Sequence, residues 1–325
     1  MEHPFESRTD LHELTTAVAA IRAEVGTVIV GQHQTIDLLL TALLADGHVL
    51  IEGVPGVAKT LTAKLLAKTL SVQFSRIQFT PDMMPADVLG TSVFSQKTGE
   101  FAYRPGPIFA NIVLIDEINR APAKTQAALF EVMEERQVTN DGTTYPLPPP
   151  FMVLATQNPI EQEGTYRLPE AQLDRFLFKV VVDYPDADEE VAILRGHHQR
   201  RHLTDALGAI KAVLSAEQLA VLRGKVSQVH VEDNLFTYIA QIIRSTRDNK
   251  SLYLGASPRA AVALLNASKA LATLRGRDFV TPEDIQELAA PVMRHRIQLT
   301  PEREMEGTTP DAVIAQLIQK MEVPR

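Results

Sequence analysis

Short, continuous apolar runs that alternate with helical patterns dominate the first half of the chain. Four of these runs, at 48–53, 112–117, 150–158 and 176–184, have the length and composition of buried strands. Residues 60–70, which follow the first run, have the spacing of a helix. Short buried strands that alternate with helices are typical of a parallel sheet covered on both faces. The pattern therefore predicts an α/β core built on a parallel sheet.

Two segments interrupt this alternation with the signals of β-hairpins. Residues 88–105 turn around Thr98-Gly99, and residues 137–150 contain the sequence NDG. Glycine after Asn or Asp favours the left-handed backbone that a tight hairpin turn requires. We therefore predict one hairpin in each segment.

The pattern changes near Asp186 and is helical from there to the end of the chain. We therefore predict two domains, a core of residues 1–186 and a helical domain of residues 187–325. Four helix starts carry a capping-box pattern or a proline at the first helical position. These starts are Asp10 with Glu13, Ser215 with Gln218, Ser257 with Pro258, and Thr281-Pro282 with Asp284.

Composition narrows the class of protein. The length of 325 residues agrees with two domains, and an apolar content of 45% is enough for an ordinary globular core. The net charge of −8 gives no general attraction for nucleic acid, and the lack of cysteine excludes disulfides and thiol catalysis. The N-terminus lacks the apolar core of a signal peptide, and the apolar run at 108–115 is too short to span a bilayer. We expect a cytoplasmic protein without a membrane span.

The sequence GVPGVAKT follows the first predicted strand and resembles a phosphate-binding loop. The usual pattern is G-x-x-x-x-G-K-[ST], and Ala58 stands where the second glycine belongs. Backbone N–H groups of such a turn and the dipole of the following helix attract phosphate. We expect Lys59 to reach the β- and γ-phosphates, Thr60 to ligate Mg²⁺, and Ala58 to enter right-handed helical geometry. The predicted nucleotide-binding residues of the loop are Gly53, Val54, Pro55, Gly56, Val57, Ala58, Lys59, Thr60 and Leu61.

Two acids end the second predicted strand, and polar residues end the third. In a P-loop enzyme, an acid at the position of Asp116 orders Mg²⁺, and one at the position of Glu117 polarises the attacking water. Asn158, in the sequence TQN, could hold this water or the γ-phosphate, but an Asn-Pro turn explains the same residue equally well. The third strand leaves both alternatives open.

Several long motifs together resemble the MoxR family of AAA+ ATPases. They are GVPGVAKT, LIDEINRAPAKTQAALFEVMEERQVTNDGTTYPLPPPF, ATQNPIEQEGTY and LPEAQLDRFLF in the first domain, and GASPRAAVALLNASKALATLRGRDFVTPEDI in the second. The resemblance covers nearly the whole chain. It implies an AAA+ P-loop NTPase αβα core with a parallel sheet, a C-terminal all-α lid, and ATP and Mg²⁺ as cofactors. Alanine before the P-loop lysine is common in this family, so we expect the loop to bind ATP.

The resemblance also assigns a role to each motif residue. The hairpins at 88–105 and 137–150 match the helix-2 insert and the pre-sensor-1 hairpin of this clade. Thr60 and Asp116 are the implied Mg²⁺ ligands. The implied roles are Walker A for Lys59 and Thr60, Walker B for Asp116 and Glu117, sensor 1 for Asn158, the arginine finger for Arg175, sensor 2 for Arg259, and adenine contact for Gly31 and Gln32.

The arginine finger carries an implication for assembly. Such a residue stabilises charge on the transferring phosphoryl group and is worth roughly 10³–10⁵ in rate. If a neighbour supplies Arg175, isolated subunits should be poor catalysts, so the resemblance implies a homo-oligomeric ring, and we expect a hexamer. Whether Arg259 acts in its own subunit stays open. Arg167 stands where the family commonly has proline, and we favour a loop residue over a second trans-acting arginine.

Three functions compete for such an ATPase. The resemblance implies a chaperone or remodelling ATPase whose protein client often carries a von Willebrand factor A (VWA) domain with a Mg²⁺-dependent adhesion site. The alternatives are a magnesium-chelatase motor subunit and an MCM-like nucleic-acid motor. The tip of the second hairpin, TNDGTTYPL, has no basic residue for phosphates, which disfavours the nucleic-acid motor. The intact motif residues disfavour a nucleotide-binding scaffold without turnover.

Overall fold

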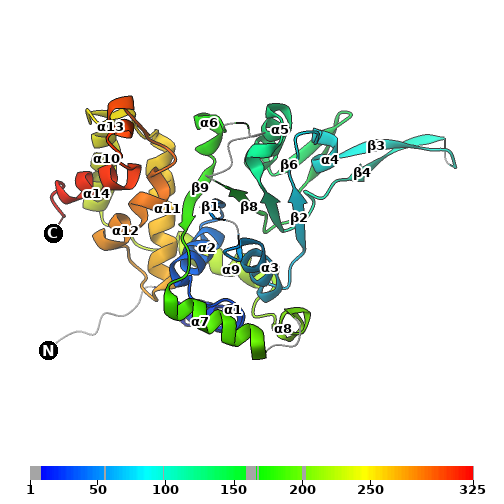
Figure 1. Ribbon diagram of the computed structural model, residues 1–325, viewed down its shortest axis with the longest axis horizontal. Helices are drawn as coiled ribbons and strands as arrows, with labels where there is room; N and C mark the ends of the chain where they lie inside the picture. Colours follow the sequence, from blue (N-terminus) through cyan, green and yellow to red (C-terminus); the bar gives the residue numbers. More distant parts are fainter. Residues whose placement is uncertain are drawn as a thin grey trace.

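The computed structural model describes residues 9–54, 56–97, 99–158, 166, 168–199 and 203–324. Its centre is a five-stranded sheet with the strand order β2-β5-β8-β1-β9, and every neighbouring pair is parallel (Figure 1). The predicted parallel sheet is therefore confirmed. The strands are β1 (His48–Gly53), β2 (Phe74–Gln78), β5 (Ile112–Asp116), β8 (Met152–Gln157) and β9 (Phe176–Val182).

β2 is a sheet strand that the apolar pattern did not predict. It lies at the edge of the sheet, and Ile77 is the buried position within it. Only one of the five positions of β2 is buried, so this strand lacks the continuous apolar run of a strand that is covered on both faces. The apolar pattern therefore identified β1, β5, β8 and β9 but not β2.

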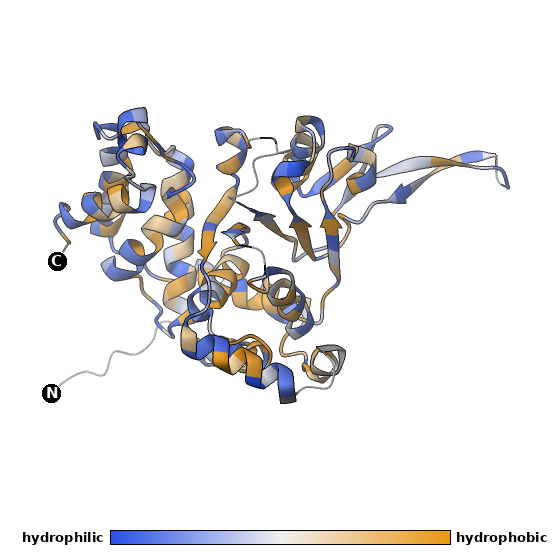
Figure 2. Cartoon of the chain, viewed as in Figure 1, coloured by the Kyte–Doolittle hydropathy of each residue, from blue (hydrophilic) through white to orange (hydrophobic). Residues whose placement is uncertain are grey.

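Alternating side chains of the strands build two hydrophobic cores on opposite faces of the sheet. In β5, Leu114 belongs to the first core, whereas Val113 and Ile115 belong to the second. Side chains of a strand alternate between its faces, so strands that are apolar at every position are buried on both sides. Apolar residues accordingly concentrate in the central sheet (Figure 2). Helices α1 (His12–Gly26), α2 (His33–Leu44) and α3 (Lys59–Thr69) contribute to the first core, and α4 (Pro85–Leu89) and α5 (Ala123–Glu135) to the second.

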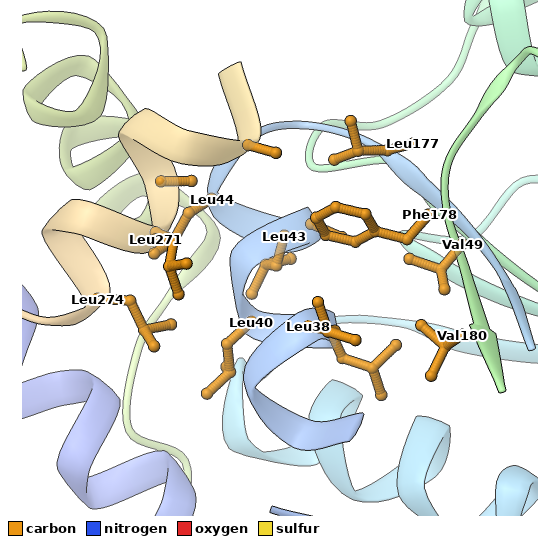
Figure 3. Close-up of a cluster of buried hydrophobic side chains, with 14 of the residues drawn as sticks. Leu38, Leu40, Leu43, Leu44, Val49, Leu177, Phe178, Val180, Leu271 and Leu274 are labelled. Carbon is orange, nitrogen blue, oxygen red and sulfur yellow. The ribbon is translucent and has the colours of Figure 1, made fainter. Parts of the chain in front are cut away.

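Helix α2 joins the sheet to the C-terminal helices. Its leucines lie between Val49 and Phe178 of the sheet and Leu271 and Leu274 of α11 (Pro258–Leu274) (Figure 3). Because α2 is covered on both sides, most of its residues are buried. Within the described ranges, no helix is long and apolar enough to cross a membrane. The other helices of this half are α7 (Ala187–Gln199), α8 (Leu203–Ala209), α9 (Ala216–Ser227), α10 (Asp233–Arg247), α12 (Pro282–Met293), α13 (Pro301–Met305) and α14 (Pro310–Gln319).

The helical half also contains a short pair of strands that the sequence pattern did not predict. β10 (Leu252–Leu254) pairs antiparallel with β11 (Gln298–Leu299). Strands of two or three residues are too short to produce a recognisable alternation. The proposed division at residue 186 falls in the connection between β9 and α7.

Three of the four predicted helix starts, at Ser215, Ser257 and Thr281, are confirmed, and the one at Asp10 is wrong. Ser215 accepts a hydrogen bond from the N–H of Gln218 (3.2 Å), and the amide oxygen of Gln218 accepts one from the N–H of Ser215 (2.8 Å). At α1, however, the N-cap is Leu11, and Asp10 accepts from the N–H of His12 (2.9 Å). Leu11 is buried, so packing sets the start of α1 and leaves Asp10 one position too early to cap it.

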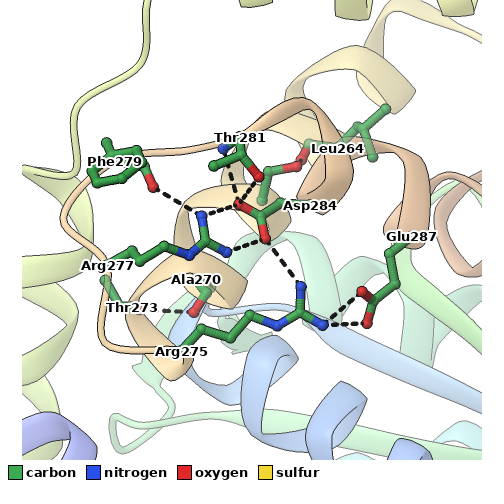
Figure 4. Close-up of polar contacts among 10 residues, drawn as sticks. Leu264, Ala270, Thr273, Arg275, Arg277, Phe279, Thr281, Asp284 and Glu287 are labelled. Carbon is green, nitrogen blue, oxygen red and sulfur yellow. Dashed lines mark hydrogen bonds and ion pairs between the residues drawn. The ribbon is translucent and has the colours of Figure 1, made fainter. Parts of the chain in front are cut away.

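Asp284 forms the predicted cap of α12 and is fully buried. Its carboxylate accepts hydrogen bonds from the N–H of Thr281 (3.0 Å), from Arg277 Nη1 (2.8 Å) and from Arg275 Nη1 (3.2 Å) (Figure 4). A buried carboxylate is tolerated when charges and donors satisfy its oxygens. The cluster fixes the corner between α11 and α12.

Both predicted hairpins are present, and the first extends well away from the body (Figure 1). Ser92 of the first donates to Asp141 of the second (2.5 Å), and the rings of Tyr103 and Tyr145 stack at 4.2 Å. These contacts join the two hairpins to each other. Thr98, in the predicted first turn, lies outside the described residues. The hairpin strands are β3 (Gly90–Ser95) with β4 (Glu100–Pro105), and β6 (Gln137–Asn140) with β7 (Thr143–Pro146).

His48, the first residue of β1, is a buried side chain with both ring nitrogens hydrogen-bonded. Nδ1 accepts from the N–H of Val153 (3.0 Å), so Nε2 carries the proton and donates to the carbonyl of Met133 (3.1 Å). Burial lowers the pKa of His48 to about 4, although the Met133 carbonyl opposes this shift. His48 is therefore neutral near pH 7 and connects β1 to β8 and α5.

This histidine should make stability depend on pH. Between pH 6.5 and about 4, the unfolded chain binds a proton on His48 that the folded chain does not. The stabilisation is complete above pH 6.5 and should fall by about 3 kcal/mol as the pH drops through this window. His48→Gln retains a donor and an acceptor but does not titrate, so its free energy of unfolding should fall less between pH 7 and pH 5. Urea unfolding at the two pH values measures this difference, and equal decreases in both proteins would contradict it.

Candidate nucleotide-binding site

The loop between β1 and α3 brings a lysine close to two acids at the carboxyl edge of the sheet. Gly56 has a φ of +90°, which favours glycine. Lys59, the first residue of α3, donates from Nζ to the carbonyl of Gly53 (2.7 Å). Partial burial lowers the pKa of Lys59, and the nearby carboxylates of Asp116 and Glu117 oppose this shift. The N-terminus of α3, the lysine and the acids therefore surround one site.

Ala58 does not have the right-handed backbone that is expected from the sequence. Its φ is 56° and its ψ is 20°, which is left-handed geometry at the N-cap of α3. A side chain with a Cβ atom costs about 1–2 kcal/mol in this conformation, which explains why the usual pattern has glycine here. Alanine has the smallest such side chain. Thr60 and Leu61 follow in the first turn of α3, whereas Pro55 lies outside the described residues.

Gly31 and Gln32 lie against the same loop. Both have positive φ values, and the amide nitrogen of Gln32 donates to the carbonyl of Val57 (3.0 Å). A Cβ atom on Gly31 would lie 2.0 Å from a carboxylate oxygen of Glu189 on α7. The segment before α2, the loop and α7 therefore meet at one point, and the positive φ of Gly31 favours glycine at this position. Adenine contact by this segment stays a prediction.

Thr156 holds the two acids together, a role that the sequence pattern did not indicate. Its hydroxyl donates to Asp116 Oδ1 (3.1 Å) and accepts from the N–H of Glu117 (3.0 Å). Glu117 has a φ of 57°, which turns the chain sharply where β5 ends. Asn158 follows the last residue of β8, at the same edge of the sheet. Because β5 and β8 are neighbouring parallel strands, their carboxyl ends bring together Asp116, Glu117, Thr156 and Asn158.

Side chains of the edge strand β2 also contact the acids. Arg76 Nε pairs with Asp116 Oδ2 at 2.6 Å, and the amide of Gln78 donates to Glu117 Oε2 (2.9 Å). Arg120 adds an ion pair to the same Glu117 oxygen at 2.8 Å. Arg76 and Gln78 alternate along β2 and so share one face. The alternation of Arg76 and Gln78 would have indicated that both contact the acids, but only if β2 had been predicted as a strand.

The polar groups at the carboxyl ends of the strands fit a nucleotide with bound Mg²⁺. Lys59 and the N-terminus of α3 supply positive charge for phosphates. Thr60 and Asp116 supply a hydroxyl and a carboxylate, the oxygen ligands that Mg²⁺ prefers. The carboxylate of Glu117 is about one-third exposed and is the group at this edge suited to accept a proton from water.

The two predicted catalytic arginines lie close together, but at the amino ends of the sheet strands. The loop and the acids lie at the opposite, carboxyl ends. Arg175 Nε and Arg259 Nη2 approach the two carboxylate oxygens of Glu134 at 3.5 and 3.2 Å. All three residues line a cleft of about 440 Å³. Arg175 precedes β9, whose first residue pairs with His48 at the amino end of β1.

The length of β1 separates this cleft from the nucleotide-binding loop. β1 has six residues, and a strand rises about 3.3 Å per residue, so its ends lie roughly 17 Å apart. Arg175 and Arg259 therefore do not reach the loop of their own subunit. Arg167 lies outside the described residues.

Comparison with known proteins identifies the family. Residues 48–178 match the ATPase family associated with various cellular activities (AAA), and residues 244–317 match an AAA lid domain. The chain is 44% identical to the chaperone MoxR1 of Mycobacterium tuberculosis, over 97% of this chain and 84% of that protein. It is 33% identical to the protein MoxR of Paracoccus denitrificans, over 84% and 86% of the two chains. The chain belongs to the MoxR family of AAA+ ATPases.

Two further comparisons extend over nearly the whole chain. The uncharacterized protein YeaC of Bacillus subtilis is 47% identical, over 97% of this chain and 96% of that protein. The crystal structure of a candidate ATPase from Cytophaga hutchinsonii is 41% identical, covers 96% of this chain and 97% of its own, and superimposes with a TM-score of 0.88. In this MoxR protein, the loop, both acids and Arg175 lie in the matched ATPase range, and Arg259 lies in the lid.

The left-handed alanine generates a stability prediction. Ala58→Gly removes the strain of the Cβ atom, although glycine also increases the entropy of the unfolded chain. We expect a net gain of about 0.5 kcal/mol in the free energy of unfolding and retained nucleotide binding. Ala58→Val should lose more than about 1 kcal/mol, because a branched side chain fits this conformation worst. Urea unfolding of wild type, Ala58→Gly and Ala58→Val measures the three free energies of unfolding. An Ala58→Val protein as stable as Ala58→Gly would contradict the left-handed geometry.

Proposed function

We propose that this MoxR protein hydrolyses ATP at the interface between neighbouring subunits of a ring, which we expect to be a hexamer. Lys59 and the loop amides bind the phosphates, and Thr60 and Asp116 hold Mg²⁺, which neutralises phosphate charge when bound. Glu117 accepts a proton from the attacking water, and Asn158 orients that water. The observation that carries the proposal is the placement of Arg175 and Arg259 at the edge of the sheet opposite the loop.

The placement favours action in trans for both arginines. They lie side by side on Glu134, so a neighbour's phosphates that reach Arg175 also reach Arg259. Two guanidinium groups at one place supply the charge that a transferring phosphoryl group requires. We therefore propose that Arg259, whose subunit the sequence left open, also acts in trans.

We further propose that the ring acts as a cytoplasmic chaperone on a protein client with a VWA domain. The relative named chaperone MoxR1 supports a protein client. The tip of the β6–β7 hairpin, Asn140 to Thr143, carries no basic residue, which argues against a nucleic-acid motor. The client assignment is tested by titrating a purified VWA domain into the ATP-bound ring, and no binding with or without Mg²⁺ would contradict it.

Arg175→Ala should bind ATP normally but hydrolyse it at least about 10³-fold more slowly, because an arginine finger acts in the transition state. Glu117→Gln subunits retain the arginines but not the catalytic carboxylate. In mixed rings their Arg175 should serve the intact loop of an Arg175→Ala neighbour, so turnover should recover. Steady-state phosphate release from the two variants, alone and mixed, measures the recovery.

Lys59→Ala is the control for the site itself. It should abolish nucleotide binding, and its mixture with Arg175→Ala should recover turnover in the same way. Tight ATP binding by Lys59→Ala would contradict the loop assignment, and mixtures without recovery would contradict donated arginines.

A further inference from the structure

The carboxylate of Asp174 joins three segments that are distant in sequence. Asp174 Oδ1 accepts from Arg296 Nε (2.6 Å), and Oδ2 accepts from the hydroxyl of Ser257 (2.9 Å). Asp174 directly precedes Arg175, and Ser257 is the N-cap of α11, two residues before Arg259. One carboxylate therefore ties together the backbone segments that carry both arginines.

Arg296 holds the same segment by its backbone. Its side chain is 3% exposed and follows the end of α12. It donates to the carbonyl oxygens of Asp174 (3.0 Å), Phe176 (2.6 Å) and Leu177 (3.1 Å), and also to that of Val292 in α12. The carbonyls of residues 174 and 176 flank Arg175 in the chain. Burial lowers the pKa of Arg296, and the hydrogen bond and charge of Asp174 oppose this shift.

The arginines themselves lack contacts that would orient them as firmly. Nε of Arg175 is buried, and its 3.5 Å approach to Glu134 does not have hydrogen-bond geometry. The side chain of Arg259 is 59% exposed and contacts Glu134 at 3.2 Å. Exposed ion pairs of this kind contribute little and do not fix a side chain. The positions of both groups therefore depend on the backbone that Arg296 and Asp174 hold.

We propose that Arg296 and Asp174 are positioning residues that hold Arg175 and Arg259 as one pair, directed at the phosphates of a nucleotide bound by the next subunit. The inference rests on the proposed function. A buried ion pair is often no more stabilising than apolar residues of the same volume, so its value here is geometric. The Arg296–Asp174 pair links the start of α11 and the end of α12 directly to the segment that carries Arg175.

Asp174→Asn and Arg296→Lys test this role. Asparagine removes the charge of Asp174 at constant size, and lysine retains the charge of Arg296 but loses the planar fork that reaches several acceptors. Each variant should bind ATP as tightly as wild type, because its own loop lies at the other edge of the sheet. The kcat of each variant should be about 10–100-fold lower than that of wild type. This loss is smaller than the roughly 10³-fold or larger loss expected for Arg175→Ala, because Arg175 is still present but less well placed. Mixing with Glu117→Gln subunits should restore turnover, since those subunits donate a well-placed arginine pair.

A matched control lies at the same end of α12. Arg294 pairs with Asp311 at 2.7 Å and also donates to the carbonyl of Lys179 (3.1 Å). Asp311→Asn therefore removes a neighbouring, more exposed arginine–aspartate pair that does not contact Asp174. Its kcat should stay within about twofold of wild type, and melting curves of all variants report folding. If Asp174→Asn does not fold, Arg296→Lys carries the same prediction.

Two outcomes would overturn the inference while leaving the proposed function intact. One is a wild-type kcat in Asp174→Asn and Arg296→Lys. The other is a lower kcat that Glu117→Gln subunits do not restore, although they restore Arg175→Ala. If Arg175→Ala is not restored either, the arrangement in trans fails and the positioning role fails with it.

Discussion

In a parallel sheet, the amino ends of all strands lie on one side and their carboxyl ends on the other. This polarity decides where the chemical groups of the molecule lie. The carboxyl edge receives the loop after β1 and the acids after β5. The amino edge receives Arg175 before β9, and Arg259 lies beside it on Glu134. The two halves of the proposed site thus lie at opposite ends of the same strands. A second subunit is the simplest way to bring them together.

Buried polar side chains fix the geometry on which this arrangement depends. His48 joins the start of β1 to its neighbours, Asp284 fixes the corner between α11 and α12, and Arg296 connects the end of α12 to the segment before β9. Apolar packing alone tolerates small shifts, whereas hydrogen-bonded groups in the interior have few alternative partners. Such contacts suit the proposed placement of two arginines against another subunit.

The sequence was sufficient for features that depend on local pattern. Continuous apolar runs identified β1, β5, β8 and β9 because most positions of these four strands are buried. It failed where tertiary contacts decide the outcome. β2 is an edge strand, Ala58 takes a left-handed backbone that the loop imposes, and Asp174 and Arg296 lie far apart in the chain. The motif residues were recognised because the resemblance is long, whereas the separation of Arg175 from the loop required the strand order.

The most direct test of the central claim is ATP turnover as a function of protein concentration, with light scattering of Glu117→Gln in ATP. A site shared between subunits predicts a specific activity that rises with concentration and a ring trapped by the glutamine variant. Turnover that is independent of concentration, from a protein that scatters as a monomer, would contradict the shared site.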